Sequence, residues 1–230
     1  LPYTEHARRY LLSEGIDGKT IFVTGSPMRE VLEKNKERIE NSNVLEDLNL
    51  KRDKYIIVSA HREENIDNEK NFFMLMNTIN SIAEKYSMEV IYSVHPRSKK
   101  FIEKRNFKFH PLVRTLKPFG FFEYNNLQKN SYCVLSDSGT LSEESSILGF
   151  SAVLLRTSTE RPEVIDKGSI VIGGIEEKTV KQSIELAISL KRDVKVNKLA
   201  IDYMDNNVSE KVVRVIQGYT QIINKCVWMK

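Results

Sequence analysis

The sequence contains little cysteine: Cys133 and Cys226 are the only two in 230 residues, and they lie far apart. Such a pair provides neither a disulfide framework nor the paired spacing of a structural zinc site. The scarcity favours a protein of the reducing cytosol. Long apolar runs are also missing, and the first residues, Leu1 to Thr4, show no signal-peptide pattern. We therefore expect a cytoplasmic protein without a membrane partner.

A large excess of one charge is absent as well. The chain has 35 Lys and Arg against 31 Asp and Glu, for a formal net charge of +4. Because the basic residues are spread along the chain, we expect no nucleic-acid partner. A modest positive balance suits an anionic small ligand. With 40% hydrophobic residues, the chain can form one sizeable domain or two small ones.

Short apolar runs alternate with amphipathic stretches, which predicts an α/β fold with a doubly wound, Rossmann-like parallel sheet. In such folds, ligands bind beyond the carboxyl ends of the strands. The predicted strands are residues 20–23, 55–59, 89–94, 133–136, 152–155 and 169–172. The predicted helices are residues 5–14, 28–36, 70–86, 121–129, 141–148, 180–190 and 209–223. The polar residues 37–52 are interpreted as a linker helix plus surface loop near a domain boundary.

The most informative segment is residues 136–144, with the sequence Ser-Asp-Ser-Gly-Thr-Leu-Ser-Glu-Glu, between a predicted strand and a predicted helix. Such a turn presents free backbone N–H groups and the positive end of a helix dipole, so a diphosphate would fit there. An ordinary capped helix is the alternative. In that case Ser138 or Thr140 is the cap, and Glu143 or Glu144 closes a capping box. Local pattern leaves both interpretations open.

Two histidines stand at the ends of other predicted strands. His61 and Arg62 follow residues 55–59, and His95 and Arg97 follow residues 89–94. A general acid or base and a phosphate clamp would have to stand at such positions. A single histidine there is usually solvated surface, but three polar clusters at one sheet edge favour a site.

A fourth cluster, residues 156–163, follows the predicted strand at 152–155. Pro162 and Glu163 suit the first turn of a helix, so part of this cluster is explained by capping alone. Arg161 can bind a diphosphate in a forked geometry beside Ser138. A solvated surface arginine is the alternative.

Five segments, taken in order and spacing, resemble the non-hydrolysing UDP-N-acetylglucosamine 2-epimerase family over nearly the whole chain. They are Thr-Gly-Ser-Pro (24–27), Ser-Ala-His-Arg-Glu-Glu-Asn (59–65), Val-His-Pro (94–96), Ser-Asp-Ser-Gly-Thr-Leu-Ser-Glu-Glu (136–144) and Thr-Glu-Arg-Pro-Glu (159–163). Within residues 136–162, the sequences of segments 136–140, 143–150 and 156–162 look most like those of the capsule and O-antigen branch, which forms UDP-N-acetyl-L-fucosamine.

This resemblance implies the C-terminal half of a glycosyltransferase-B-like fold that holds a UDP-sugar between two Rossmann-like halves. The implied reaction is epimerisation at C2 by elimination and re-addition of UDP, with no metal and no redox cofactor. His61 would be the catalytic or diphosphate-contacting histidine. The implied UDP-binding residues are Ser138, Gly139, Thr140 and Arg161 at the diphosphate, Glu144 at the ribose, Tyr124 near the uracil, and His95.

The resemblance also has gaps. Thr140 stands where many family members have a second glycine, and Glu63 stands where an arginine is common. Phe119 falls roughly where the better known members have a glutamine. The resemblance implies that the family's proton-transferring carboxylates lie in a first domain and that this chain starts near the end of that domain. We therefore expect residues 1–27 to be a remnant of that domain with the crossover, 28–205 a UDP-binding domain, and 206–230 a helix returning to the first domain. Homodimers are common in the family.

Two other functions stay open. The same fold serves glycosyltransferases, because fold does not decide function. A non-catalytic remnant that only binds nucleotide or a partner subunit is the other alternative.

Overall fold

The computed structural model describes residues 1–159, 161–191 and 200–229. The chain forms two compact units. The larger is Lys36–Lys198, and the smaller combines both ends of the chain, Leu1–Asn35 and Leu199–Lys230. No helix in the described ranges is long and apolar enough to cross a lipid bilayer.

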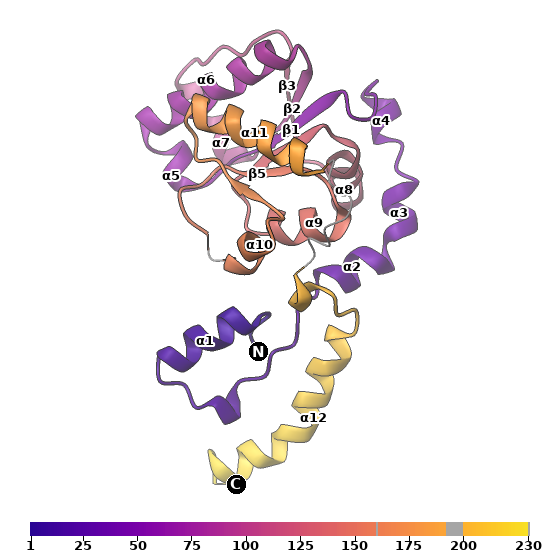
Figure 1. Ribbon diagram of the computed structural model, residues 1–230, viewed down its shortest axis with the longest axis vertical. Coiled ribbons are helices and arrows are strands. Elements are labelled where there is room, and N and C mark those ends of the chain that lie inside the picture. The colour runs from indigo at the N-terminus through magenta and orange to yellow at the C-terminus, as the bar shows by residue number, and fades with distance from the viewer. Residues whose placement is uncertain (160, 192–199, 230) are drawn as a thin grey trace. The chain divides into compact units, whose positions relative to one another are not determined.

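The larger unit is built on a six-stranded parallel sheet (Figure 1). Its strands are β1 (Tyr55–Ser59), β2 (Glu89–Ser93), β3 (Val113–Leu116), β4 (Cys133–Ser136), β5 (Ala152–Leu154) and β6 (Val171–Ile172). The spatial order is β3-β2-β1-β4-β5-β6, so the winding reverses between β1 and β4. Ser59 and Ser136 are register partners, and both strands therefore end at the same level. The switch point of a doubly wound sheet lies between them.

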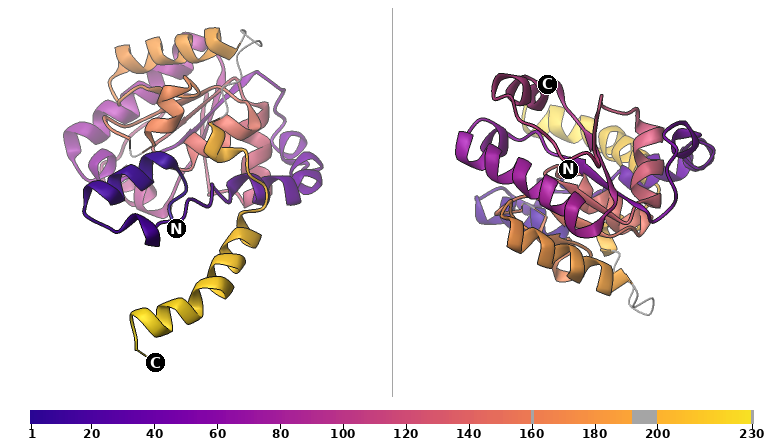
Figure 2. Two further views of the ribbon diagram at one scale, coloured as in Figure 1. Left: turned by 60° about the horizontal axis from the view of Figure 1, so that its bottom comes forward. Right: turned by 90° about the horizontal axis from the view of Figure 1, so that it is seen from above.

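Helices cover both faces of this sheet. Those of the larger unit are α3 (Lys36–Glu40), α4 (Val44–Asp47), α5 (Glu63–Ile66), α6 (Glu69–Tyr86), α7 (Pro96–Lys104), α8 (Phe121–Asn130), α9 (Leu141–Leu148), α10 (Pro162–Asp166) and α11 (Glu177–Lys191). On one face α6 and α11 lie side by side, as Figures 1 and 2 show. On the other face, Tyr55 donates a hydrogen bond from its hydroxyl to the carbonyl of Leu127 in α8, at 2.7 Å. Helix α8 in turn contacts α3 and α4.

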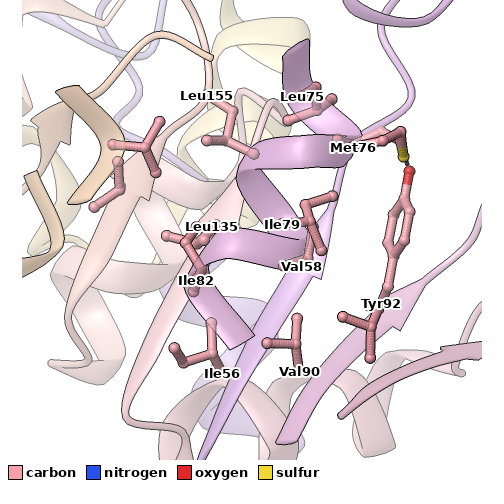
Figure 3. Close-up of a cluster of buried hydrophobic side chains, with 14 of the residues drawn as sticks. Ile56, Val58, Leu75, Met76, Ile79, Ile82, Val90, Tyr92, Leu135 and Leu155 are labelled. Atoms are coloured by element: carbon pink, nitrogen blue, oxygen red, sulfur yellow. Dashed lines mark hydrogen bonds between the residues drawn. The ribbon is translucent and has the colours of Figure 1, made fainter. Parts of the chain in front are cut away.

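The main core lies between α6, α11 and the sheet (Figure 3). Alternate strand residues such as Ile56 and Val58 face α6, whose Leu75 and Ile79 lie on the same helical stripe. All four side chains are fully buried. Each such aliphatic side chain contributes about 1.5–3 kcal/mol by leaving water. This packing holds the strand ends in place.

The smaller unit contains α1 (Glu5–Ser13), a 3-10 turn (Gly18–Thr20), α2 (Met28–Lys34), a second 3-10 turn (Ile201–Tyr203) and α12 (Val208–Cys226). Glu30 of α2 joins the two ends of the chain, because it accepts hydrogen bonds from the Ser209 backbone N–H at 2.9 Å and from the Ser209 hydroxyl. It also pairs with Lys34 at 2.7 Å. Lys34 first, and then Ser209, lower the pKa of Glu30 to about 2.

Much of the apolar surface of α12 is not covered. Val213 is 64% exposed, Ile216 59% and Ile222 49%. Phe22 does pack edge-on against Tyr219, with ring centroids 4.6 Å apart. An exposed apolar stripe of this length on a helix is typical of an interaction surface.

The structure confirms the predicted bounds of β1, β4 and α9, and it corrects the first predicted strand. Thr20 ends a 3-10 turn, and residues 21–23 pair with no strand in the described chain. The apolar run there serves the smaller unit through Phe22 instead. The turn at 24–27 therefore follows no strand, although it does lead into α2. The elements that were not predicted include β3, whose exposed edge position tolerates Arg114 and Thr115, the short helix α5, and α7, whose sequence is strongly charged.

Removing core volume should destabilise the larger unit. Ile79→Ala leaves a cavity beneath the sheet, so we expect the free energy of unfolding to fall by about 2–5 kcal/mol in urea titrations. Leu186→Ala on α11 is the control, because that side chain is 49% exposed. It should change the free energy of unfolding by no more than about 0.5 kcal/mol. Equal losses in the two variants would contradict this assignment of the core.

Candidate functional site

The predicted polar clusters meet at the carboxyl edge of the sheet. His61 follows β1, His95 follows β2 and the turn at 137–140 follows β4. The imidazoles of His61 and His95 stack with ring centroids 5.0 Å apart and an interplanar angle of 30°. Nδ1 of His61 lies 3.5 Å from Oδ1 of Asp137. Three neighbouring strands thus bring their terminal polar residues into one cluster.

Asp137 organises this cluster. Its side chain is fully buried, and Oδ2 accepts hydrogen bonds from the backbone N–H groups of His61 and Arg62, both at 2.9 Å. Oδ2 also accepts from the amide of Asn65 at 3.1 Å, and Asn65 donates to the Leu155 carbonyl at 3.0 Å. Hydrogen bonds to a carboxylate are stronger than neutral ones. Asp137 therefore ties the turn after β1 to the turn after β4.

This role of Asp137 and Asn65 was not predicted from the sequence. Both were visible in the motifs at 59–65 and 136–144. An acidic residue at the buried end of a central strand needs hydrogen-bond donors, and this requirement was the signal.

The turn at 138–140 leads directly into α9. The hydroxyls of Ser138 and Thr140 lie 3.0 Å apart, and the Ser138 backbone N–H donates to the Ser136 hydroxyl at 3.1 Å. Thr140 occupies the N-cap position but makes no side-chain capping bond. The Thr140 side chain therefore does not form its half of the alternative capping box. Two hydroxyls and a glycine instead stand at the positive end of the helix, where an anion is favoured.

Behind this turn, α9 buries two carboxylates, Glu143 and Glu144. Gln128 donates to Oε2 of Glu144 at 2.9 Å. Burial raises the pKa of Glu144, and the hydrogen bonds from Gln128 and Thr140 oppose this rise. Arg161 lies 3.4 Å from Glu143, so it stands beside the first turn of α9 as the sequence suggested.

Tyr124 on α8 faces the same region. Burial raises the pKa of Tyr124 and the nearby Glu144 raises it further, whereas Ser59 and Ser136, at the switch point between β1 and β4, oppose the rise. The hydroxyl thus lies near the ends of both central strands.

The arginine that follows His95 is engaged elsewhere. Arg97 binds Asp67 through two nitrogens, at 2.6 and 3.0 Å, and Glu63 at 2.9 Å. Two carboxylates therefore compensate its charge, which disfavours a phosphate-clamp role. Glu63, the residue that departs from the family pattern, is one of these partners.

The described residues contain no group of three or more His, Cys, Asp or Glu side chains that could hold a metal ion. The groups that the cluster offers to a ligand are imidazoles, hydroxyls, a guanidinium and the amino end of a helix. This set is suited to a phosphorylated ligand.

Comparison with known proteins decides the family. A sequence model described as UDP-N-acetylglucosamine 2-epimerase matches residues 1–217. The chain belongs to the UDP-N-acetylglucosamine 2-epimerase family. One relative, the UDP-N-acetylglucosamine 2-epimerase of Methanocaldococcus jannaschii, is 33% identical over 221 residues, which is 93% of this chain and 59% of the relative.

Solved structures of family members agree. A UDP-N-acetylglucosamine 2-epimerase from Rickettsia bellii superposes with a TM-score of 0.87 and 34% identity, covering 99% of this chain and 61% of that one. The M. jannaschii enzyme in complex with UDP-GlcNAc and UDP gives a TM-score of 0.83 and 31% identity, over 94% of this chain and 59% of that one. The predicted α/β, Rossmann-like fold is confirmed. This epimerase-family chain spans about three fifths of the length of these relatives.

The buried carboxyl of Glu144 predicts a pH dependence of stability in this family member. Because its folded pKa lies above the ordinary value of 4.5, the ionised form is disfavoured in the folded chain. The free energy of unfolding should therefore fall as the pH rises from that ordinary value to the raised folded one. Glu144→Gln should lack this loss and be more stable than the native chain above that window. Below the window the two should be similar.

Urea unfolding between about pH 4 and about pH 8 measures the difference. Glu37→Gln, which changes an exposed carboxylate on α3, is the control and should follow the native chain at every pH. If Glu144→Gln also follows the native chain, burial does not disfavour the charge at Glu144.

Proposed function

We propose that this chain binds the nucleotide of a UDP-N-acetylhexosamine and forms the UDP-binding part of a 2-epimerase. The observation that carries the proposal is the hydroxyl-lined turn at the start of α9, which Asp137 links to His61. Relatives with the same fold are described as complexes with UDP-GlcNAc, including the M. jannaschii structure. A Neisseria meningitidis 2-epimerase bound to UDP-GlcNAc, with 27% identity, is another.

In this proposal the diphosphate lies at the amino end of α9. Ser138 and Thr140 offer hydroxyls, Gly139 allows close approach, and Arg161 supplies a forked positive charge. Arg161 already stands 3.4 Å from Glu143, so binding would exchange part of that ion pair for phosphate contacts.

The nucleoside would extend towards α8 and Glu144. One oxygen of Glu144 accepts from Gln128, and the carboxyl can accept ribose hydroxyls through its remaining lone pairs. Tyr124 would lie near the uracil. His61 and His95 border the diphosphate from the β1 and β2 side.

The proposed chemistry is proton transfer at C2 coupled to loss and return of UDP. A base removes the C2 proton, the C1–O bond breaks, and its electrons leave with the diphosphate. UDP then adds back to C1 while a proton reaches the opposite face of C2. In this chain His61, the α9 turn and Arg161 would stabilise the departing diphosphate. The C2 acid and base would come from the part of the family's length that has no counterpart here.

The proposal includes a division of the chain into three parts. The UDP-binding domain would be residues 28–205, preceded by a remnant of the first domain (1–27) and followed by a returning helix (206–230). The apolar stripe of α12 would pack against a counterpart of the other two fifths of the relatives' length, and the assembled protein would be a homodimer. The reaction would form UDP-N-acetyl-L-fucosamine from its C2 epimer, or else UDP-N-acetylmannosamine. Either product would serve the synthesis of bacterial surface polysaccharide.

Diphosphate recognition is tested by calorimetric titration of UDP. We expect UDP to bind the native chain, and Arg161→Ala to weaken binding about 10- to 100-fold, because a charge-assisted hydrogen bond is lost. Uridine, which lacks phosphate, should bind weakly and equally to both. Arg52→Ala, an exposed arginine before β1 at the opposite sheet edge, is the matched control. Retention of full UDP affinity in Arg161→Ala would overturn the assigned diphosphate site.

The reaction itself is tested by NMR in deuterated water. The chain is combined with a polypeptide that supplies the rest of the family's length, and UDP-GlcNAc is added. We expect deuterium at C2 of the recovered UDP-sugar, with UDP retained in the sugar nucleotide. Stoichiometric release of UDP with a new glycoside would show a glycosyltransferase instead. UDP binding without either reaction would favour a non-catalytic nucleotide-binding protein.

A further inference from the structure

The stacked histidines are held by different hydrogen-bonding surroundings. His95 is the N-cap of α7, and its Nδ1 accepts the backbone N–H of Arg97 at 3.2 Å. A nitrogen that accepts carries no proton, so the proton of neutral His95 must be on Nε2. This ring is exposed and therefore presents an N–H donor outward.

His61 is in the opposite situation. Its Nδ1 faces Oδ1 of Asp137 at 3.5 Å, and Asp137 is fully buried. All three hydrogen bonds that Asp137 accepts go to Oδ2, and Oδ1 forms none among the described residues. A buried carboxylate oxygen without a donor is costly. A proton on Nδ1 of His61 satisfies it after a shift of a few tenths of an ångström, the kind of tightening that active sites show on binding a ligand.

We propose that Asp137 and the amino end of α7 fix the two stacked imidazoles in opposite tautomers. His61 then presents a basic Nε2 to the ligand, while His95 presents an Nε2–H donor. Asp137 is the positioning residue, because it acts through His61. The site thereby has one imidazole that can take up a proton and one that donates a hydrogen bond while neutral.

The two rings also differ in the charges around them. The Asp137 carboxylate faces His61, whereas the Arg97 guanidinium that follows His95 is compensated by Asp67 and Glu63. Arg62, adjacent to His61, pairs with Glu64 at 3.4 Å.

The tautomers are read by NMR of the full chain with 15N-labelled histidine, under mildly alkaline conditions and without ligand. Each histidine is assigned by its His→Gln variant. We expect the proton on Nδ1 of His61 and on Nε2 of His95. A wild-type His61 protonated on Nε2 would overturn the proposal, whatever happens in any variant.

Asp137→Asn tests the cause. The Asn oxygen can accept the three hydrogen bonds now made to Oδ2, and its NH2 group then donates to Nδ1 of His61. The His61 proton should move to Nε2, while the unchanged His95 signal shows that the fold is intact. Asp47→Asn, an exposed carboxylate on α4, should leave both tautomers unchanged. An unmoved His61 proton in a folded Asp137→Asn chain would contradict the positioning role.

Discussion

The site depends on one buried carboxylate. Asp137 is at the end of a central strand, where it must find hydrogen-bond donors inside the protein, and it finds them in the backbone of the neighbouring turn at His61 and Arg62. The cost of burying a charge is thereby offset by three hydrogen bonds that also define the position of that turn. Removing these donors would leave an uncompensated charge in the core, so the turn at 61–65 has little freedom to move.

The parallel sheet makes this interaction possible. Because Ser59 and Ser136 are register partners, the two turns begin side by side at the reversal of strand order. The hydroxyl of Tyr124 from α8 lies near both serines. Strand register and a buried aspartate therefore specify the same local geometry, with a partly buried tyrosine beside them. The family relationship is consistent with a scaffold of this kind for a nucleotide sugar.

The sequence was most informative where local pattern and burial agree. The run at β1 is apolar and β-branched, the run at β4 is apolar, and the bounds of both were predicted correctly. The apolar run at 20–23 looked the same but contributes to the smaller unit, because tertiary contacts such as Phe22 with Tyr219 decide its use. Partners were not predictable: nothing local indicates that Arg97 binds Asp67 and Glu63, or that Asp137 reaches back 76 residues to His61. Side-chain pairing across such separations is set by the sheet topology.

The contact between Glu30 and Ser209 has a consequence for how the chain folds. These residues are 179 positions apart in the sequence, so joining them in an otherwise unstructured chain would cost about 4–5 kcal/mol of loop-closure entropy. Folding of the Rossmann-like unit shortens that effective separation before the ends meet. The smaller unit is therefore expected to assemble after the Rossmann-like unit, once α12 has been synthesised. During translation its early helices, α1 and α2, would emerge long before their partner α12 exists.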